Sequence, residues 1–547
     1  MKKIISIWMI VMSMSVIQSC TDLDPEVYSE ILPEEYFENE QQLLAFTAAA
    51  YTSLQSHWGT QIILGDAVSD VSTVPIRSNG GWDDGGIWPR LMRHEFTSTN
   101  NVSGAWNLAF NGVATCNRLI EFLQLQSNIE PSVIAELKAL RAYYLWFGLD
   151  HFGNIPVELR FAEADPNPKQ STPAEAFAVI ESELLDAIPD LKEDKDISTY
   201  AKMNKWVAYM TLAKLYINAE RYEAGAHYTE AAGAIDKIIE GDKYSLEGGY
   251  FANFRTENEG SSENMFVVPY DRTVFGGFDL SHQALHQSAG PTFGYSGAPW
   301  GGYSIQEDFY NSYDADDKRR GMFIVGQQYS QAAGPTWTND AGFFYANPKD
   351  EFKLYNCDED FNGFSPGERD QLGWPPNSDG GNLEAACNIF ITPDYKFTVG
   401  EEGVRPNITP YRHGARFGKF ELELNAPPGL NNDFPIFRYG EALLIRAEAL
   451  FRANGDNAES RMLIDQIRKR VDLDPLASLT LDDIYQELKK EMAIEGKGRE
   501  ISIRFGHWED EWMLKTDSDP RKRWFPIPQE QIDANPSLVQ VDYVTGG

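Results

Sequence analysis

Hydrophobic residues recur at helical spacing along two long stretches of the chain, and the stretch between them lacks this pattern. Within residues 205–222, Ala208, Leu212, Leu215 and Ala219 follow one another at steps of four, three and four residues. This spacing places the four side chains on one face of a helix. Comparable patterns in the first stretch predict helices over residues 43–54, 103–123, 131–151, 173–188, 204–219 and 222–239.

The second helical stretch lies between residues 434 and 497. Apolar residues form one stripe over residues 439–453, and Gly455 follows, which can adopt the left-handed conformation that ends a helix. A second helix is predicted over residues 458–471. A helix, a tight turn and a second helix resemble a tetratricopeptide (TPR) unit, although any α-hairpin produces the same pattern.

The stretch between these two regions, residues 245–432, is rich in Gly, Pro, Asn, Asp and aromatic residues. Short strands are expected within it, for example over residues 265–270 and 389–392. A long irregular region inside a compact protein is usually functional. We therefore predict a mainly α fold, a TPR-like helical-hairpin scaffold with a long loop-rich insert that contains a few short strands.

The N-terminus has the layout of a secretory signal. Lys2 and Lys3 precede an apolar segment that is too short to span a bilayer comfortably, and this segment ends at Ile17-Gln18-Ser19-Cys20. A small residue directly before a cysteine resembles a bacterial lipobox, in which cleavage precedes the cysteine and its thiol receives the lipid. A plain signal peptide with an incidental cysteine is the alternative. The acidic residues after Cys20 resemble the surface-export signal of some Gram-negative lipoproteins, and an ordinary solvated tether is the other interpretation.

These patterns divide the chain into five regions. They are a lipoprotein signal peptide (1–19), a tether (20–32), an N-terminal TPR-containing helical region (33–244), a loop-rich ligand-face region (245–432) and a C-terminal helical region with a tail (433–547).

The chain carries a formal net charge of −35 at pH 7, from 47 basic and 82 acidic residues. Removal of residues 1–19, which include two lysines, would bring the charge to about −37. Such a surface repels phosphate backbones and anionic lipid, which argues against nucleic-acid binding and against electrostatic docking onto a membrane. Neutral ligands such as sugars remain compatible with this charge.

Two aromatic clusters have the composition of a sugar-binding surface, in which rings lie on the apolar faces of a sugar while polar groups fix its hydroxyls. The first cluster contains Trp82 and Trp88 beside the glycine pairs Gly80-Gly81 and Gly85-Gly86, with Arg77, Asn79 and Asp83 nearby. The second contains Tyr295, Trp300 and Tyr303. The alternative is that these rings pack the loops onto the scaffold. Trp106, Trp146 and Trp206 lie within helical patterns and are predicted to be core residues.

Signatures of metal sites are weak in this sequence, and no cofactor is expected. Asp358, Asp360 and Asn362 match the start of a calcium loop, but position twelve is Arg369 instead of Glu, so an ordinary loop is favoured over structural calcium. His282 and His286 are four residues apart and are interpreted as surface histidines. Cys357 and Cys387 could form a disulfide, and Cys116 is the third cysteine left after lipidation.

Signatures of enzymes are absent in the sequence. The chain contains no GxSxG, HExxH, P-loop or dinucleotide-binding motif in a suitable context. Glycosidases need only two suitably placed carboxylates, so the 82 acidic residues leave a hydrolase open. We predict that the protein is not an enzyme.

Several segments together resemble the SusD/RagB family of nutrient-uptake outer-membrane lipoproteins. They are RAYYLWFGLDHFGNIP at residues 141–156, the alanine-rich helix at 205–222, DADDKR at 314–319, FPIFRYGEALLIRAEAL at 434–450, IDQIRKR at 464–470 and the tail with Ile527-Pro528, Asn535-Pro536 and Gln540. They occur in the order found in the family. Residues 487–506 depart from its pattern around Gly496–Gly498 and at Ile501-Ser502.

This resemblance implies a TPR-containing scaffold with a looped ligand face and a partner, a SusC-like TonB-dependent transporter. It implies a protein anchored in the outer membrane by its N-terminal lipid and facing the cell exterior. We therefore expect a surface lipoprotein that binds a nutrient ligand, an oligosaccharide or polysaccharide, and delivers it to that transporter. A surface carbohydrate-active hydrolase and the same transporter role with a peptide ligand are the alternatives.

Overall fold

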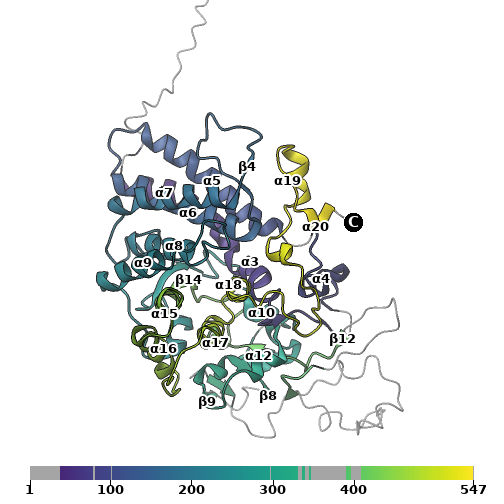
Figure 1. Cartoon of the computed structure of the whole chain (residues 1–547). Coiled ribbons are helices and arrows are strands. Elements are labelled where there is room, and N and C mark those ends of the chain that lie inside the picture. Colours follow the sequence, from purple (N-terminus) through teal and green to yellow (C-terminus); the bar gives the residue numbers. More distant parts are fainter. Residues whose placement is uncertain are drawn as a thin grey trace, which may run out of the picture.

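The computed structural model in Figure 1 describes residues 37, 39–77, 81–99, 102–295, 297–329, 335–338, 344–346, 390–395 and 408–545. Several predictions fall on residues outside these ranges, namely lipidation of Cys20, the ligand role of Asn79, the calcium candidates Asp358, Asp360 and Asn362, and the pairing of Cys357 with Cys387. Within the described part, no helix combines the length and apolar content that a membrane span requires.

Five N-terminal helices pack one after another as the helical scaffold predicts: α5 (Ser103–Gln124), α6 (Pro131–Phe152), α7 (Pro173–Ala187), α8 (Lys205–Ile217) and α9 (Tyr228–Gly241). Helices α6 and α7 each begin with a proline, where the missing N–H has no partner to lose. Thr172 forms a capping box with Glu175 at the start of α7. Helix α9 begins six residues later than predicted because residues 218–223 form turns and residues 225–227 lack regular structure.

The C-terminal helices extend the same stack. Helix α15 (Tyr439–Asn454) contacts α9, although the long insert separates them in sequence, and α16 (Ala458–Arg470) and α17 (Leu481–Met492) pack against α15. Helix α18 (Gly498–Phe505) contacts α17. The predicted mainly α scaffold is therefore confirmed.

A short sheet joins the insert to the scaffold. Strand β14 (Phe434–Arg438), which immediately precedes α15, pairs antiparallel with β5 (Asn264–Val268). All residues of both strands are buried. The sequence pattern placed residues 434–438 in a helical motif. They form a strand instead, because β5 supplies their hydrogen-bond partners.

The remaining described elements are short, and those within residues 245–432 fit the predicted loop-rich insert. The helices are α2 (Glu40–Ala48), the 3-10 helix η2 (Ala49–Ser56), α3 (His57–Gln61), η3 (Ile62–Asp66), η4 (Asp84–Gly86), α4 (Ile87–Met92), η5 (Ile188–Asp190), η6 (Tyr250–Phe254), α10 (Leu280–Ala284), η7 (Gln287–Ala289), α11 (Gly290–Phe293), α12 (Glu307–Asn311), η8 (Lys318–Met322), η12 (Pro520–Arg523), α19 (Gln529–Ala534) and α20 (Asp542–Thr545). The strands form two-stranded sheets: β1 (Ser72–Thr73) with β6 (Ser304–Ile305), β2 (Ile76–Arg77) with β12 (Ile408–Thr409), β3 (Ile155–Pro156) with β4 (Gln170–Ser171), β7 (Phe323–Ile324) with β13 (Arg416–Phe417), β8 (Gly326–Gln327) with β11 (Phe390–Ile391), and β9 (Pro335–Thr338) with β10 (Phe344–Ala346).

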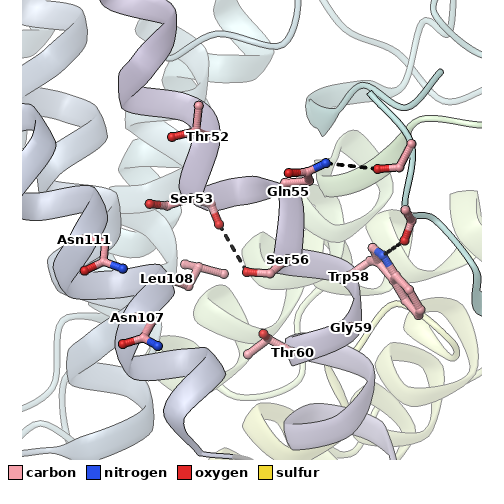
Figure 2. A pocket seen from close by; sticks show the side chains of 12 residues that line it. Thr52, Ser53, Gln55, Ser56, Trp58, Gly59, Thr60, Asn107, Leu108 and Asn111 are labelled. Carbon is pink, nitrogen blue, oxygen red and sulfur yellow. Dashed lines mark hydrogen bonds between the residues drawn. The ribbon is translucent and has the colours of Figure 1, made fainter. Parts of the chain in front are cut away.

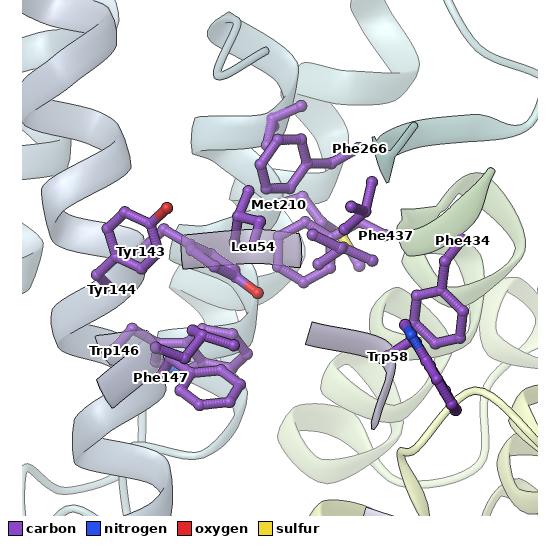
Figure 3. Close-up of a cluster of buried hydrophobic side chains, with 14 of the residues drawn as sticks. Leu54, Trp58, Tyr143, Tyr144, Trp146, Phe147, Met210, Phe266, Phe434 and Phe437 are labelled. Atoms are coloured by element: carbon purple, nitrogen blue, oxygen red, sulfur yellow. The ribbon is translucent and has the colours of Figure 1, made fainter. Parts of the chain in front are cut away.

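The main core lies where α6 meets the sheet and the N-terminal helices. Figure 3 shows aromatic side chains of α6 facing Phe266 of β5 and Phe437 of β14. The ring centroids of Tyr143 lie 5.6 Å from Phe266 and 5.8 Å from Phe437. Trp106, Trp146 and Trp206 are buried, which confirms their prediction as core residues.

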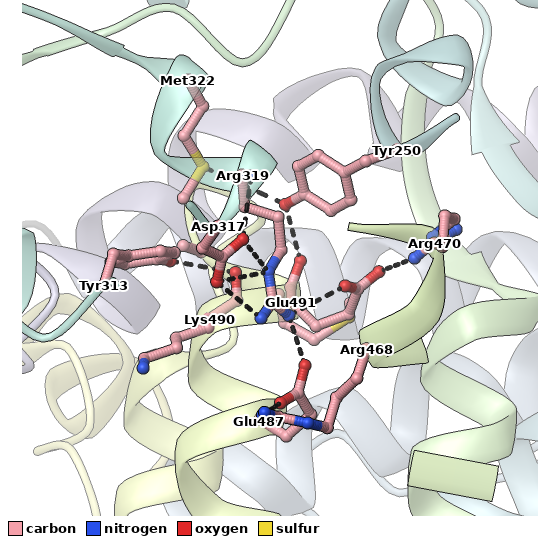
Figure 4. A network of polar contacts seen from close by, with 12 residues as sticks. Tyr250, Tyr313, Asp317, Arg319, Met322, Arg468, Arg470, Glu487, Lys490 and Glu491 are labelled. Carbon is pink, nitrogen blue, oxygen red and sulfur yellow. Dashed lines mark hydrogen bonds and ion pairs between the residues drawn. The ribbon is translucent and has the colours of Figure 1, made fainter. Parts of the chain in front are cut away.

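A buried ionic network fixes α17 to the insert and to α16 (Figure 4). Glu491 of α17 accepts hydrogen bonds from Arg319, Arg438 and Arg470, which come from three different parts of the chain. Burial alone would raise the pKa of Glu491, but the charges of Arg470, Arg438 and Arg319 together hold it well below its usual range. The carboxylate therefore stays ionised and cross-links three segments.

The sequence departs from the SusD/RagB pattern around residues 496–498, and this departure has a structural reason. The Asp66 carboxylate accepts hydrogen bonds from the backbone N–H groups of Gly496 and Gly498, each at 3.0 Å. A Cβ on Gly65 would lie 2.0 Å from the carbonyl oxygen of Gly496, and Gly496 has a φ of +75°. Only glycine permits this close approach of η3 to the segment before α18.

Candidate ligand-binding site

The two aromatic clusters predicted from sequence come together in space. We call Trp82, Trp88, Trp300 and Tyr303 the aromatic platform. The ring centroid of Trp82 lies 5.5 Å from Trp88, 6.1 Å from Trp300 and 5.9 Å from Tyr303, and those of Trp88 and Tyr303 are 5.9 Å apart. Residues more than 200 positions apart thus form one surface feature.

Local backbone geometry presents the rings from the N-terminal side of the platform. Trp82 has a φ of +62°, and Gly85 and Gly86 that follow also have positive φ. These turns lead into α4, which carries Trp88, and the Trp88 indole Nε1 donates a hydrogen bond of 2.6 Å to Asp84 Oδ2. Non-glycine residues seldom adopt a positive φ. Where they do, the segment is often a constrained functional one.

The two halves of the platform are joined directly. The Trp82 indole Nε1 donates a hydrogen bond of 2.8 Å to the carbonyl oxygen of Trp300. The Trp82 ring lies so close to Gly302 that a Cβ at that position would come within 2.3 Å of the ring. The glycine next to Tyr303 is therefore required for the packing of Trp82.

Trp300 is the most exposed member of the platform, with 49% of its surface accessible, while Trp82 and Trp88 are half-buried. An exposed indole beside two partly exposed ones offers apolar ring faces to a ligand. Asp83 is half-buried next to Trp82 and stays a prediction as a hydrogen-bonding partner.

His282 is a platform neighbour that sequence reasoning missed. Its ring lies edge-on to Trp300 at 5.1 Å and stacks on Tyr295 at 5.6 Å, and its carbonyl accepts a 2.7 Å hydrogen bond from the Trp300 backbone N–H. Burial lowers the pKa of His282, which favours the neutral ring at pH 7. The interpretation as a surface histidine is wrong for His286, which is buried, whereas His282 is half-buried and partly accessible.

Three predicted ligand-binding residues are buried in this structure, and their contact with a ligand stays a prediction. Arg77 is fully buried, and Tyr303 and Tyr295 are 1% and 8% exposed. The Arg77 guanidinium donates hydrogen bonds to the carbonyl oxygens of Gly301 at 2.7 Å and Gly302 at 3.0 Å. It lies inside because these backbone acceptors need donors away from water.

Two family models match this chain, one described as the SusD family over residues 425–505 and one described as starch-binding associating with outer membrane over residues 23–217. The starch-binding protein SusD of Bacteroides thetaiotaomicron is 24% identical over 433 residues, which cover 74% of this chain and 72% of that protein. The chain belongs to the SusD-like family. A SusD-like protein of Bacteroides ovatus is 22% identical, and the alignment covers 87% of this chain and 78% of that protein.

Solved structures share this SusD-like fold. Surface glycan-binding protein A from Bacteroides thetaiotaomicron, in complex with laminarihexaose, aligns with a TM-score of 0.66 at 20% identity, over 92% of this chain and 100% of that chain. A laminarin binding SusD-like protein aligns with a TM-score of 0.65 at 17% identity, again over 92% of this chain and 100% of that one.

The described residues of this SusD-like protein contain no group of three or more His, Cys, Asp or Glu side chains arranged to hold a metal ion. Cys116 is a buried free cysteine in α5, and burial raises its pKa to about 12, so its thiol stays protonated at neutral pH. The chemistry that the described site offers is therefore ring stacking and hydrogen bonding.

Proposed function

We propose that this SusD-like protein binds a neutral oligosaccharide or polysaccharide on the aromatic platform, without transforming it. The observation that carries the proposal is the convergence of Trp82, Trp88 and Trp300 into one partly exposed surface. Its relatives include a starch-binding protein and a laminarin binding protein, which supports a glycan as the ligand.

The geometry suits a sugar chain better than an ion or a small apolar ligand. Indole faces match the C–H faces of pyranose rings, and the neighbouring Asp83 and backbone groups can accept hydrogen bonds from hydroxyls. The net charge of −35 would repel an acidic polysaccharide, whereas a neutral glycan is unaffected.

The place of binding in nutrient uptake is the second part of the proposal. The lipobox-like segment before Cys20 supports a lipid anchor in the outer membrane, facing the cell exterior. Membership of the SusD-like family supports a SusC-like TonB-dependent transporter as the partner that receives the glycan. The rigid stack of α5 to α9 and α15 to α17 would serve as the body that docks, while loops carry recognition.

Titration calorimetry of the protein without residues 1–19 tests the binding site, with starch fragments, laminarihexaose and a set of oligopeptides as ligands. Trp300→Ala is expected to weaken glycan binding by ~1–3 kcal/mol with little change in melting temperature. Phe161→Ala is the matched control, because Phe161 is also 49% exposed but is not part of the platform. Unchanged affinity of the Trp300 variant would reject the platform as the site.

The same samples separate the alternatives. Release of reducing ends from a polysaccharide would show a hydrolase, and binding of oligopeptides alone would show the transporter role with a peptide cargo. Either result would replace the glycan-binding proposal.

A further inference from the structure

Two segments of this strongly acidic chain contain no Asp, Glu, Lys or Arg: residues 41–65 and residues 96–117. Charged residues make up 24% of the chain, so two uncharged segments of this length stand out from the rest. In the structure they pack together, because η2 and α3 of the first contact α5 of the second. The uncharged character is thus concentrated in one place on the molecule.

A groove of about 520 Å³ lies between these segments and the turn at Gly276-Gly277. Figure 2 shows Asn107 and Asn111 of α5 on one side and side chains of η2 and α3 on the other. Its polar lining consists of the hydroxyls of Thr52, Ser53, Ser56 and Thr60 and of side-chain amides, and no charged side chain of the described residues lines it.

Hydrogen bonds within the protein hold the far wall of the groove in place. Gln55 Nε2 donates to the carbonyl oxygen of Gly276 at 3.1 Å, and the Trp58 indole Nε1 donates to that of Gly277 at 2.7 Å. Both bonds tie the turn at residues 276–277 to the N-terminal helices. This turn is therefore held in place beside the groove.

The opposite wall carries polar groups that are available to a ligand. Asn107 and Asn111 are exposed and lie one helical turn apart, so their amides share one face of α5. Within the described part of the chain, no hydrogen bond to another protein group involves either side chain. The Thr52 hydroxyl donates to its own helix, to the Ala49 carbonyl at 2.8 Å, and keeps its lone pairs free to accept.

We propose that this groove is a second carbohydrate-binding site, separate from the aromatic platform. Amides supply both donors and acceptors and hydroxyls supply acceptors, a combination that complements the hydroxyls of a neutral sugar. An ion would lack a counter-charge in the groove, and an apolar ligand would leave the amides without partners. The class of ligand in this proposal rests on the proposed function, whereas the position of the site does not.

The two sites are close along the chain. Gly277 in the groove wall precedes His282, the neighbour of Trp300, by five residues, so their Cα atoms are separated by at most about 17 Å. A polysaccharide held at one site would raise the local concentration of its own sugar units at the other.

Hydrogen-exchange mass spectrometry with starch fragments and laminarihexaose tests the proposal, because it reports each site separately. Saturating ligand is expected to slow exchange about two-fold or more in peptides covering residues 49–61 and 103–112 of the wild-type protein. The double variant Asn107→Ala/Asn111→Ala should lose this protection and retain that of residues 81–92 and 297–303. Alanine is a better helix former than asparagine, so α5 should stay folded. Gln466→Ala, an exposed amide on α16, is the control and should behave as wild type.

Each outcome decides one of the two sites. Protection confined to the platform peptides, or protection of the groove that survives in the double variant, would overturn the second site and leave the proposed function intact. Protection confined to the groove would support the second site and reject the platform. An absence of protection at both, as expected if the groove is instead covered by a protein, would overturn both proposals.

Discussion

Replacement of Arg77 by methionine should both destabilise the protein and weaken glycan binding, although Arg77 is buried. Its guanidinium donates to the carbonyl oxygens of Gly301, Gly302, His413 and Pro410 at distances between 2.7 and 3.3 Å. Methionine has a similar length but donates nothing, so these buried acceptors would lose a partner.

The magnitude follows from the number of acceptors. An unsatisfied buried carbonyl costs about 1 kcal/mol or more, and three of the four bonds are 3.0 Å or shorter, so we expect a loss of about 3 kcal/mol in the free energy of unfolding. Arg77→Lys retains the charge and part of the donors and should lose less. Glycan affinity should fall in the same order, because the carbonyls of residues 301 and 302 belong to the segment that carries Trp300.

Urea unfolding and titration of laminarihexaose on the same samples measure both effects, and Arg118→Met, on the exposed side of α5, is the control. If Arg77→Met unfolds at the wild-type midpoint and binds as tightly as wild type, the assignment of Arg77 as the support of the platform is refuted.

Three further predictions concern the fold and the anchor. Glu491→Gln removes the charge shared by three buried arginines and should lower the free energy of unfolding by about 3 kcal/mol in urea titrations, and an unchanged midpoint would contradict this. Burial raises the pKa of Asp433 to about 7, so its protonated form stabilises the fold at low pH and this stabilisation is lost as pH rises from about 4 to about 7. Asp433→Asn should lack this loss and gain up to roughly 4 kcal/mol on wild type between pH 4 and pH 8, and parallel pH profiles of the urea midpoints would exclude it. Cys20→Ala should leave the protein folded but absent from the membrane fraction of cells, and unaltered fractionation would disprove the lipid anchor.

The helices could be predicted from sequence where local signals coincide. The apolar periodicity and the proline at its start placed α6 within one residue of its observed end, and α16 was placed equally well. Strand β14 could not be predicted in this way, because its pairing with β5 depends on residues about 170 positions away. Local periodicity carries no information about such a partner.

The candidate site was predictable by residue type but not by arrangement. The glycines around Trp82 and Trp88 indicated exposed rings, and both are half-buried, while Trp300 of the second cluster is 49% exposed. Nothing in the sequence joined Trp300 to Trp82. The sequence also marked Arg77 as a polar candidate without revealing the carbonyls that surround it. The sequence marked His282 only by its spacing from His286, since its contact with Trp300 exists only in the folded protein.

Buried side chains hold the platform in place more than regular secondary structure does. This difference matters for the specificity of ligand binding. Arg77 fixes the backbone of residues 301 and 302, and the Trp82 ring packs on Gly302 while its indole holds the Trp300 carbonyl. We expect the ring of Trp300 to add little to this framework, because about half of its own surface is in solvent. Substitutions at Trp300 should therefore change which glycan binds at almost no cost to the fold, whereas substitutions at Arg77 change both. A surface of this kind can alter its ligand through its exposed rings while the helical stack beneath it stays the same.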